Sequence, residues 1–128
     1  MDNEAPASSA SPTPISGAQS FALTDEQRIA LAAKAEAGDA ESAFRLSLHY
    51  TFTFSDAEQS MHWLSMAARG GHGVAQHNLA YDLYMDGTDL EKAAYWAAEA
   101  QKNGNDEAGW LLKQIETEKV VSGWSPLT

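Results

Sequence analysis

The feature that most constrains this chain of 128 residues is a helical repeat with a fixed period of 33 residues. The period aligns three glycines, three leucines and two tryptophans: Gly38, Gly71 and Gly104; Leu46, Leu79 and Leu112; and Trp63 and Trp96. A period of this length is typical of α-solenoids, in which each helix pair packs only on its neighbours. The sequence therefore predicts an all-α fold, a short right-handed α-α superhelix of about three helix pairs.

Start and stop signals divide the repeat region into six expected helices. Capping boxes are expected at Thr24, Ser55 and Thr88, because each is followed three residues later by Gln or Glu. Asn105 is expected to cap the last helix, and a glycine follows the end of most helices. In the first helix the apolar residues at helical spacing, predicted to face the core, are Ile29, Ala30, Ala33 and Ala37.

One loop departs from its copy in the next repeat. Phe52 and Phe54 stand where the next repeat has an Asp-Gly turn. Two aromatic residues at this point either pack inward or form an exposed apolar point, and inward packing is favoured.

The two ends of the chain differ in composition from the repeats. Residues 1–20 are rich in Ala, Ser and Pro and are predicted to form a disordered tail or tether. The repeat domain is expected over 24–118, and residues 119–128 are expected to form a tail that folds back over the last helix. The N-terminal tail is similar to the spacer after the lipidated cysteine of bacterial lipoproteins, which favours a periplasmic domain over a cytoplasmic one. An ordinary flexible N-terminus is the alternative.

Composition excludes several classes of function. The formal net charge is −10, which argues against a nucleic-acid partner because such binding needs clustered Lys and Arg. An acidic surface suits a cationic partner, or serves solubility alone. The chain has no cysteine, so disulfides and thiolate chemistry are absent. No apolar run approaches the length of a transmembrane helix.

The repeat resembles the Sel1-like repeat family, a relative of the tetratricopeptide solenoids. The residues that carry the resemblance are Ala75, Leu79 and Tyr81 in the first helix and Lys92, Ala93, Trp96, Ala100 and Gly104 in the second. The family's usual glycine after the first-helix leucine is replaced by Ser47, Ala80 and Lys113, and Lys113 suggests that the last helix lacks a full packing partner. The resemblance implies a protein-binding adaptor, and some bacterial members are immunity proteins that neutralise a toxin.

Binding in related tetratricopeptide solenoids uses fixed positions of the first helix in each pair. Carried onto this sequence, the expected partner-binding residues are Phe44, Leu48, His77, Tyr81, Tyr84, Trp110 and Gln114, with Glu41 and Glu107 at the edge of the groove. Acidic residues beside aromatic ones would suit a basic segment of another protein. For Phe44 and Trp110, packing between adjacent helices is the open alternative, whereas Trp63 and Trp96 are expected to be structural.

Catalytic signals are weak. His72 and His77 are five residues apart, which does not place them on one helical face as metal ligands. No phosphate-binding loop, nucleophile elbow or dinucleotide motif occurs, so no catalytic residue, metal or cofactor is expected. The predicted function is a non-enzymatic protein-binding module, in its finer form an immunity protein. A scaffold or regulatory adaptor that self-associates through its C-terminal end is the alternative, and a small histidine-dependent hydrolase is a third.

Overall fold

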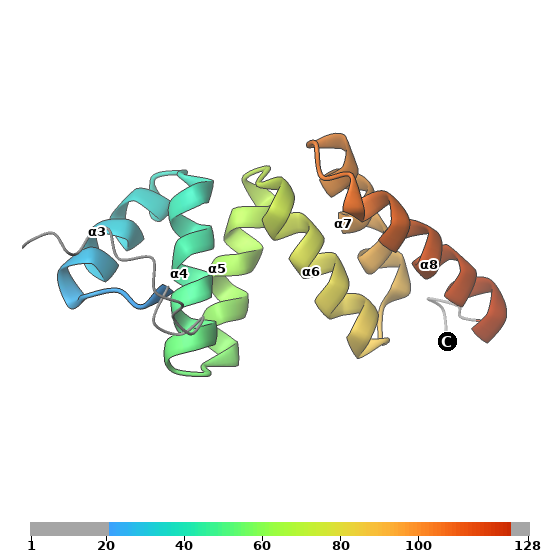
Figure 1. Cartoon of the computed structure of the whole chain (residues 1–128), viewed down its shortest axis with the longest axis horizontal. Coiled ribbons are helices and arrows are strands. Elements are labelled where there is room, and N and C mark those ends of the chain that lie inside the picture. Colours follow the sequence, from blue (N-terminus) through green and yellow to red (C-terminus); the bar gives the residue numbers. More distant parts are fainter. Residues whose placement is uncertain (1–20, 124–128) are drawn as a thin grey trace, which may run out of the picture.

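All regular structure in the described part of the chain is helical. The computed structural model describes residues 21–123, and six helices follow one another along the long axis of the molecule (Figure 1). They are α3 (Asp25–Glu36), α4 (Ala40–Thr53), α5 (Ala57–Arg69), α6 (Gly73–Asp86), α7 (Leu90–Lys102) and α8 (Glu107–Ser122). Helices α4 and α5 pack against each other, as do α6 and α7, while α3 adjoins α4 and α8 adjoins α7. The predicted all-α solenoid of about three helix pairs is confirmed.

Glycines in the left-handed conformation mark the predicted repeat boundaries. The φ angles of Gly38, Gly71 and Gly104 are 110°, 91° and 93°, a region that side chains disfavour. At the end of α5, Gly71 donates its N–H to the carbonyl of Ala68, and the next residue donates to the carbonyl of Ala67. These bonds satisfy carbonyls that a helix end would otherwise leave unpaired. The 33-residue period of the sequence therefore corresponds to a left-handed backbone conformation that recurs at each repeat boundary.

The helix caps keep the period but differ in position from two of the predictions. The capping box at Thr24 is confirmed. The boxes predicted at Ser55 and Thr88 are wrong by one residue, because Asp56 and Asp89 cap α5 and α7. Their carboxylates accept backbone N–H groups at 3.1 and 3.0 Å and are the stronger acceptors at the positive end of a helix. Ser55 instead adopts a left-handed turn conformation with φ 52°.

The core consists mainly of small alanines with a few large side chains. One cluster joins α3 to α6 and a second joins α6 to α8. Leu46 and Ile115 are the largest fully buried side chains. Trp63 is buried in the first cluster, and Trp96 packs against both clusters. Trp96 therefore acts as a wedge between neighbouring repeats, the structural role expected of both tryptophans.

The predicted inward face of α3 is wrong. Leu31 and Ala35 are buried, whereas Ile29 is 60% exposed and Ala30, Ala33 and Ala37 are also exposed. As the first described helix of the array, α3 packs chiefly on α4. A helix with one packing partner buries only a narrow stripe, here two residues one turn apart.

A buried amide joins successive repeats. Gln76 of α6 donates from Nε2 to the carbonyl of Ala68 and accepts at Oε1 from Asn103 Nδ2, each at 2.9 Å. Asn103 also donates to the carbonyl of Glu99 at 3.1 Å. A buried amide whose donor and acceptor are both satisfied stabilises one packing register of the neighbouring helices over the alternatives. This network ties the C-terminal ends of α5 and α7 to the first turn of α6.

The aromatic loop after α4 does not pack inward as favoured. Helix α4 continues to Thr53, and both Phe52 and Phe54 are exposed, Phe54 by 62%. The Phe52 ring stacks on Phe21 with 5.2 Å between centroids, and the Phe54 and His49 rings form a T-shaped pair, also with 5.2 Å between centroids. Both rings lie outside the buried core clusters and contact aromatic neighbours instead.

The boundary predicted at residue 118 lies inside α8, which continues to Ser122. Val120 and Val121 are helical and exposed rather than part of a returning tail. The other residues of the predicted tail cap, Trp124, Pro126 and Leu127, lie outside the described residues, as does the predicted tether over 1–20. Among the helices that the structure describes, none is long and apolar enough to cross a membrane.

Candidate protein-binding surface

Three of the predicted binding residues line one hollow between α4, α5 and α6. Leu48 of α4 and both His77 and Tyr81 of α6 surround a cavity of about 340 Å³, which we call the Tyr81 hollow. Its other lining residues are Ser47, Thr51 and Phe52 of α4, Ser60 and Leu64 of α5, and Asn78 and Asp82 of α6. Because its walls come from three successive helices, the solenoid packing itself shapes this hollow.

The walls of the Tyr81 hollow combine apolar and hydrogen-bonding groups. Leu48, Leu64 and Phe52 contribute carbon surface, and the side chain of Tyr81 is half exposed. Thr51 and Ser60 share a hydrogen bond between their hydroxyls, so each retains further capacity to accept one. Sites that bind other molecules typically combine apolar walls with a few placed polar groups.

Asp82 gives this hollow its charge. Its side chain lines the Tyr81 hollow and also a neighbouring hollow of about 240 Å³, which shares Thr51 and Ser60. Asp82 is exposed overall, but partial burial of its carboxylate raises its pKa above the ordinary value of 3.8, because the charged form loses some contact with water. Asp82 is therefore a carboxylate whose ionised form is destabilised in the folded protein.

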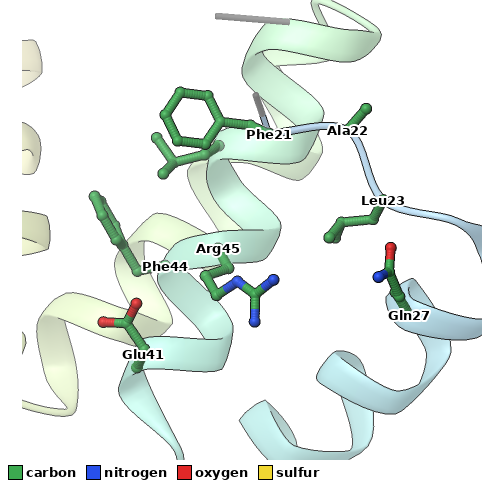
Figure 2. Close-up of a pocket in the computed structure, with 8 residues that line it drawn as sticks. Phe21, Ala22, Leu23, Gln27, Glu41, Phe44 and Arg45 are labelled. Atoms are coloured by element: carbon green, nitrogen blue, oxygen red, sulfur yellow. The ribbon is translucent and has the colours of Figure 1, made fainter. Parts of the chain in front are cut away.

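A second hollow adjoins the first through Leu48. It measures about 420 Å³ and lies between α4, α3 and the segment before α3 (Figure 2). We call it the Phe44 hollow. Its lining residues are Phe21, Ala22, Leu23, Gln27, Glu41, Phe44, Arg45 and Leu48. In Figure 2 the Arg45 guanidinium points from α4 toward α3, with Phe44 and Glu41 on its other side. Two of the predicted residues, Phe44 and Glu41, thus lie beside the Tyr81 hollow rather than in it.

Glu41 and Phe44 also contact the start of the next repeat. Glu41 Oε1 lies 2.8 Å from His72 Nε2, and the Phe44 ring lies 4.5 Å from the His72 ring. His72 is the N-cap of α6, since its Nδ1 accepts the Ala75 N–H at 3.1 Å. The acceptor role of Nδ1 assigns the ring proton to Nε2, which donates to Glu41. Phe44 is half-buried, so it combines core packing with an exposed edge.

The remaining predicted residues lie elsewhere on the first helices. Tyr84 lines a separate hollow of about 420 Å³ with Glu118 of α8, and Glu107 lines another of about 430 Å³ with Val74. Trp110 is 67% exposed and Gln114 is half-buried on α8. Neither lines a hollow described above. The predicted set therefore forms one cluster around Leu48, with further residues spaced along α6 and α8.

The histidines occupy separate environments. His49 is buried, and its Nδ1 accepts the Leu23 N–H at 3.1 Å. Burial lowers the pKa of His49 below its ordinary value of 6.5, and the charge of Arg28 acts in the same direction. Within residues 21–123, no three side chains of His, Asp or Glu are grouped so that they could hold a metal ion.

The binding prediction missed several residues that line the two hollows. Phe52 was expected in the core, Phe21 falls just before the predicted first helix, and Ser60 belongs to a second helix. The available signal was the replacement of an Asp-Gly turn by Phe52 and Phe54, for which an exposed apolar point was the alternative to inward packing. Asp82, which is also not among the predicted residues, lines the Tyr81 hollow.

Comparison with known proteins identifies the repeat. No family model matches the chain. It is 38% identical over 80 residues to the Sel1-repeat-containing protein YjcO of Escherichia coli K12, a match that covers 62% of this chain and 34% of YjcO. It also superposes on the crystal structure of a Sel1 repeat protein from Oxalobacter formigenes with a TM-score of 0.59 and 28% identity, over 67% of this chain and 69% of the other. The chain is a Sel1-repeat protein.

A further relative matches more of this Sel1-repeat protein. The uncharacterized protein YibG of Escherichia coli K12 is 30% identical over 109 residues, covering 79% of this chain and 70% of YibG. The match to YjcO, in contrast, spans about a third of that protein's length. Sel1 repeats generally mediate protein–protein interactions and typically act as non-enzymatic adaptors, so the family suggests that a protein partner binds this chain.

Proposed function

We propose that this Sel1-repeat protein is a non-enzymatic module that binds a basic segment of a partner protein across the Tyr81 and Phe44 hollows. The observation that carries the proposal is the Tyr81 hollow itself, in which Leu48, His77 and Tyr81 from two first helices meet around one cavity. The adjoining Phe44 hollow shares Leu48 and extends this surface toward α3. An extended segment of a partner would cross both hollows.

Tyr81 has the properties of an anchor for such a partner. Half of its surface is exposed, although its ring stands beside apolar walls from α4 and α5. Tyrosine gives a large contact area at low cost in conformational entropy and is frequent among residues that dominate binding energy. The net charge of −10 favours a basic partner and speeds its approach.

A finer form of the proposal is that the partner is a secreted bacterial toxin, which this protein neutralises as an immunity protein. The small acidic domain supports this form, since an acidic inhibitor suits a cationic enzyme. Self-association is the second candidate. It is supported by the exposed Trp110, Val120 and Val121 along α8 at the end of the described array.

Site-specific photocrosslinking in the native host tests the proposal. A photoreactive phenylalanine analogue replaces Tyr81 in one variant and Tyr95 in the matched control. Tyr95 is a tyrosine of similar exposure, 55% against 50%, on the second helix α7. We expect the variant at residue 81 to crosslink to a distinct partner, which mass spectrometry then identifies, and the variant at residue 95 not to do so. Equal crosslinking from both positions, or only to copies of the same chain, would contradict the proposed site.

A further inference from the structure

The acidic residues of the binding surface are not equivalent. Glu41 accepts a hydrogen bond from His72, and Glu107 lies in a different hollow at the start of α8. Asp82 is the carboxylate that lines the Tyr81 hollow. Asp82 is accessible to a partner because it is exposed, yet partial burial of its carboxylate raises its pKa, and no hydrogen bond or cation in the described part of the chain opposes this effect. A partly desolvated carboxylate is stabilised when a cation comes to meet it.

The groups around Asp82 favour one kind of cation. The hydroxyls of Thr51 and Ser60 and the side-chain amide of Asn78 line the same cavity and supply further acceptors. The Tyr81 ring and the apolar wall of Leu48 supply surface on which a flat group stacks. A guanidinium has five N–H donors in one plane and stacks on aromatic rings, whereas an ammonium is a compact point charge with three donors.

We propose that the Tyr81 hollow takes one arginine side chain of the partner protein, with the guanidinium bound to Asp82 and stacked on the Tyr81 ring, and the aliphatic stem along Leu48. This inference rests on the proposed function, because it names the group that the partner presents at that site. On this proposal, a basic partner is selected by one arginine at one site and not only by general attraction to the net negative charge of the chain. The Phe44 hollow next to it, with Phe21 and Leu23 in its wall, would then take an apolar residue close to the arginine.

The test uses peptides selected for binding. A random peptide library is displayed and selected against the full chain, and the enriched peptides are resynthesised in three forms. The first form retains arginine, the second carries citrulline, which has nearly the same shape without the charge, and the third carries lysine. Affinities are measured for the wild type, Asp82→Asn, Tyr81→Ala and the controls Tyr95→Ala and Glu36→Gln. Glu36→Gln removes the same unit charge from an exposed position of α3.

We expect the preference for arginine in the peptide to depend on Asp82 in the protein. With the wild type, citrulline or lysine in place of arginine weakens binding by about tenfold or more, as for loss of a charge-assisted hydrogen bond. With Asp82→Asn, the arginine and citrulline peptides bind equally well, because the group that distinguishes them is gone. Glu36→Gln retains the full preference for arginine. Circular dichroism and the urea midpoint of each variant establish that it is folded.

Two kinds of failure are distinguishable. If the peptides depend on Tyr81 and not on Tyr95, yet bind equally with arginine, lysine or citrulline, the arginine site is wrong and the binding surface stands. The same holds if the preference for arginine persists in Asp82→Asn. If no enriched peptide depends on Tyr81, both the arginine site and the proposed function are wrong.

Discussion

His72 Nε2 lies 2.8 Å from Glu41 Oε1, so the first residue of one repeat is held by the first turn of the repeat before it. The same imidazole caps α6 through Nδ1 and packs against Phe44. One side chain therefore sets the start of α6, and with it the position of the α6 wall of the Tyr81 hollow relative to α4.

Replacing His72 tests this link through helix capping. We expect His72→Ala to lower the free energy of unfolding by about 1 kcal/mol, since the Ala75 N–H loses its acceptor. His72→Asn is the matched control, because Asn105 accepts the N–H of Ala108 at the equivalent position one repeat later. Urea denaturation measures both. Equal losses for Ala and Asn would contradict the capping role.

Replacing Asp82 is expected to stabilise the fold while it weakens binding. Because burial raises the pKa of Asp82, the folded protein binds this proton more tightly than the unfolded chain does. Ionisation of Asp82 therefore lowers stability above the raised pKa, and this cost disappears as pH falls toward 3.8. Asp82→Asn should be more stable than the wild type at pH 7, with a difference that shrinks on acidification. Stability curves across this range that show Asp82→Asn less stable at pH 7 would contradict the account.

His49 is expected to make the stability of the fold depend on pH near and below its ordinary pKa of 6.5. Since burial lowers its folded pKa, the unfolded chain binds the proton more tightly. The contribution of neutral His49 is complete above its ordinary pKa of 6.5 and is lost as pH falls below it. His49→Asn retains an acceptor for the Leu23 N–H and removes the titration, so its stability should change less between pH 7 and 5. The matched control is His62→Asn, which replaces a histidine on the exposed surface of α5.

Substitution of a repeat-boundary glycine is expected to lower the stability of the fold through backbone conformation alone. Gly71 has φ 91°, and a Cβ placed there meets no atom within 4 Å, so an added methyl group clashes with nothing beyond its own backbone. Gly71→Ala should lower the free energy of unfolding by about 1 kcal/mol or more, the cost of a left-handed conformation for a residue with a side chain. Gly71→Asn should cost less, because asparagine adopts this conformation more readily. Equal stability of all three forms in urea denaturation would show that the turn relaxes.

The fold could be predicted closely from the sequence, because the repeat depends on glycines, leucines and helix caps whose effects are local. Its errors arose where tertiary context decides. The inward face of α3 depends on its packing chiefly against α4, which left Ile29 exposed. The caps at Asp56 and Asp89 depend on which of two adjacent acceptors the turn geometry favours.

The candidate site could be predicted only in part. Family positions led to Leu48, His77 and Tyr81, which line one hollow because equivalent residues of stacked helices lie side by side. They did not lead to Phe21, Phe52 or Ser60, since a hollow between helices also takes its lining from segments that have no place in the first-helix pattern. Which carboxylate faces the hollow depends on contacts such as that of Glu41 with His72, and these are visible only in three dimensions.

The most direct test of the central claim is the dissociation constant of the crosslinked partner for matched tyrosine variants, measured by titration calorimetry. We expect Tyr81→Ala to weaken binding by about 2 kcal/mol, as for an interface anchor, and Tyr95→Ala to change it little. A folded Tyr81→Ala variant that binds the partner as tightly as the wild type would contradict the claim that the Tyr81 hollow is the binding site.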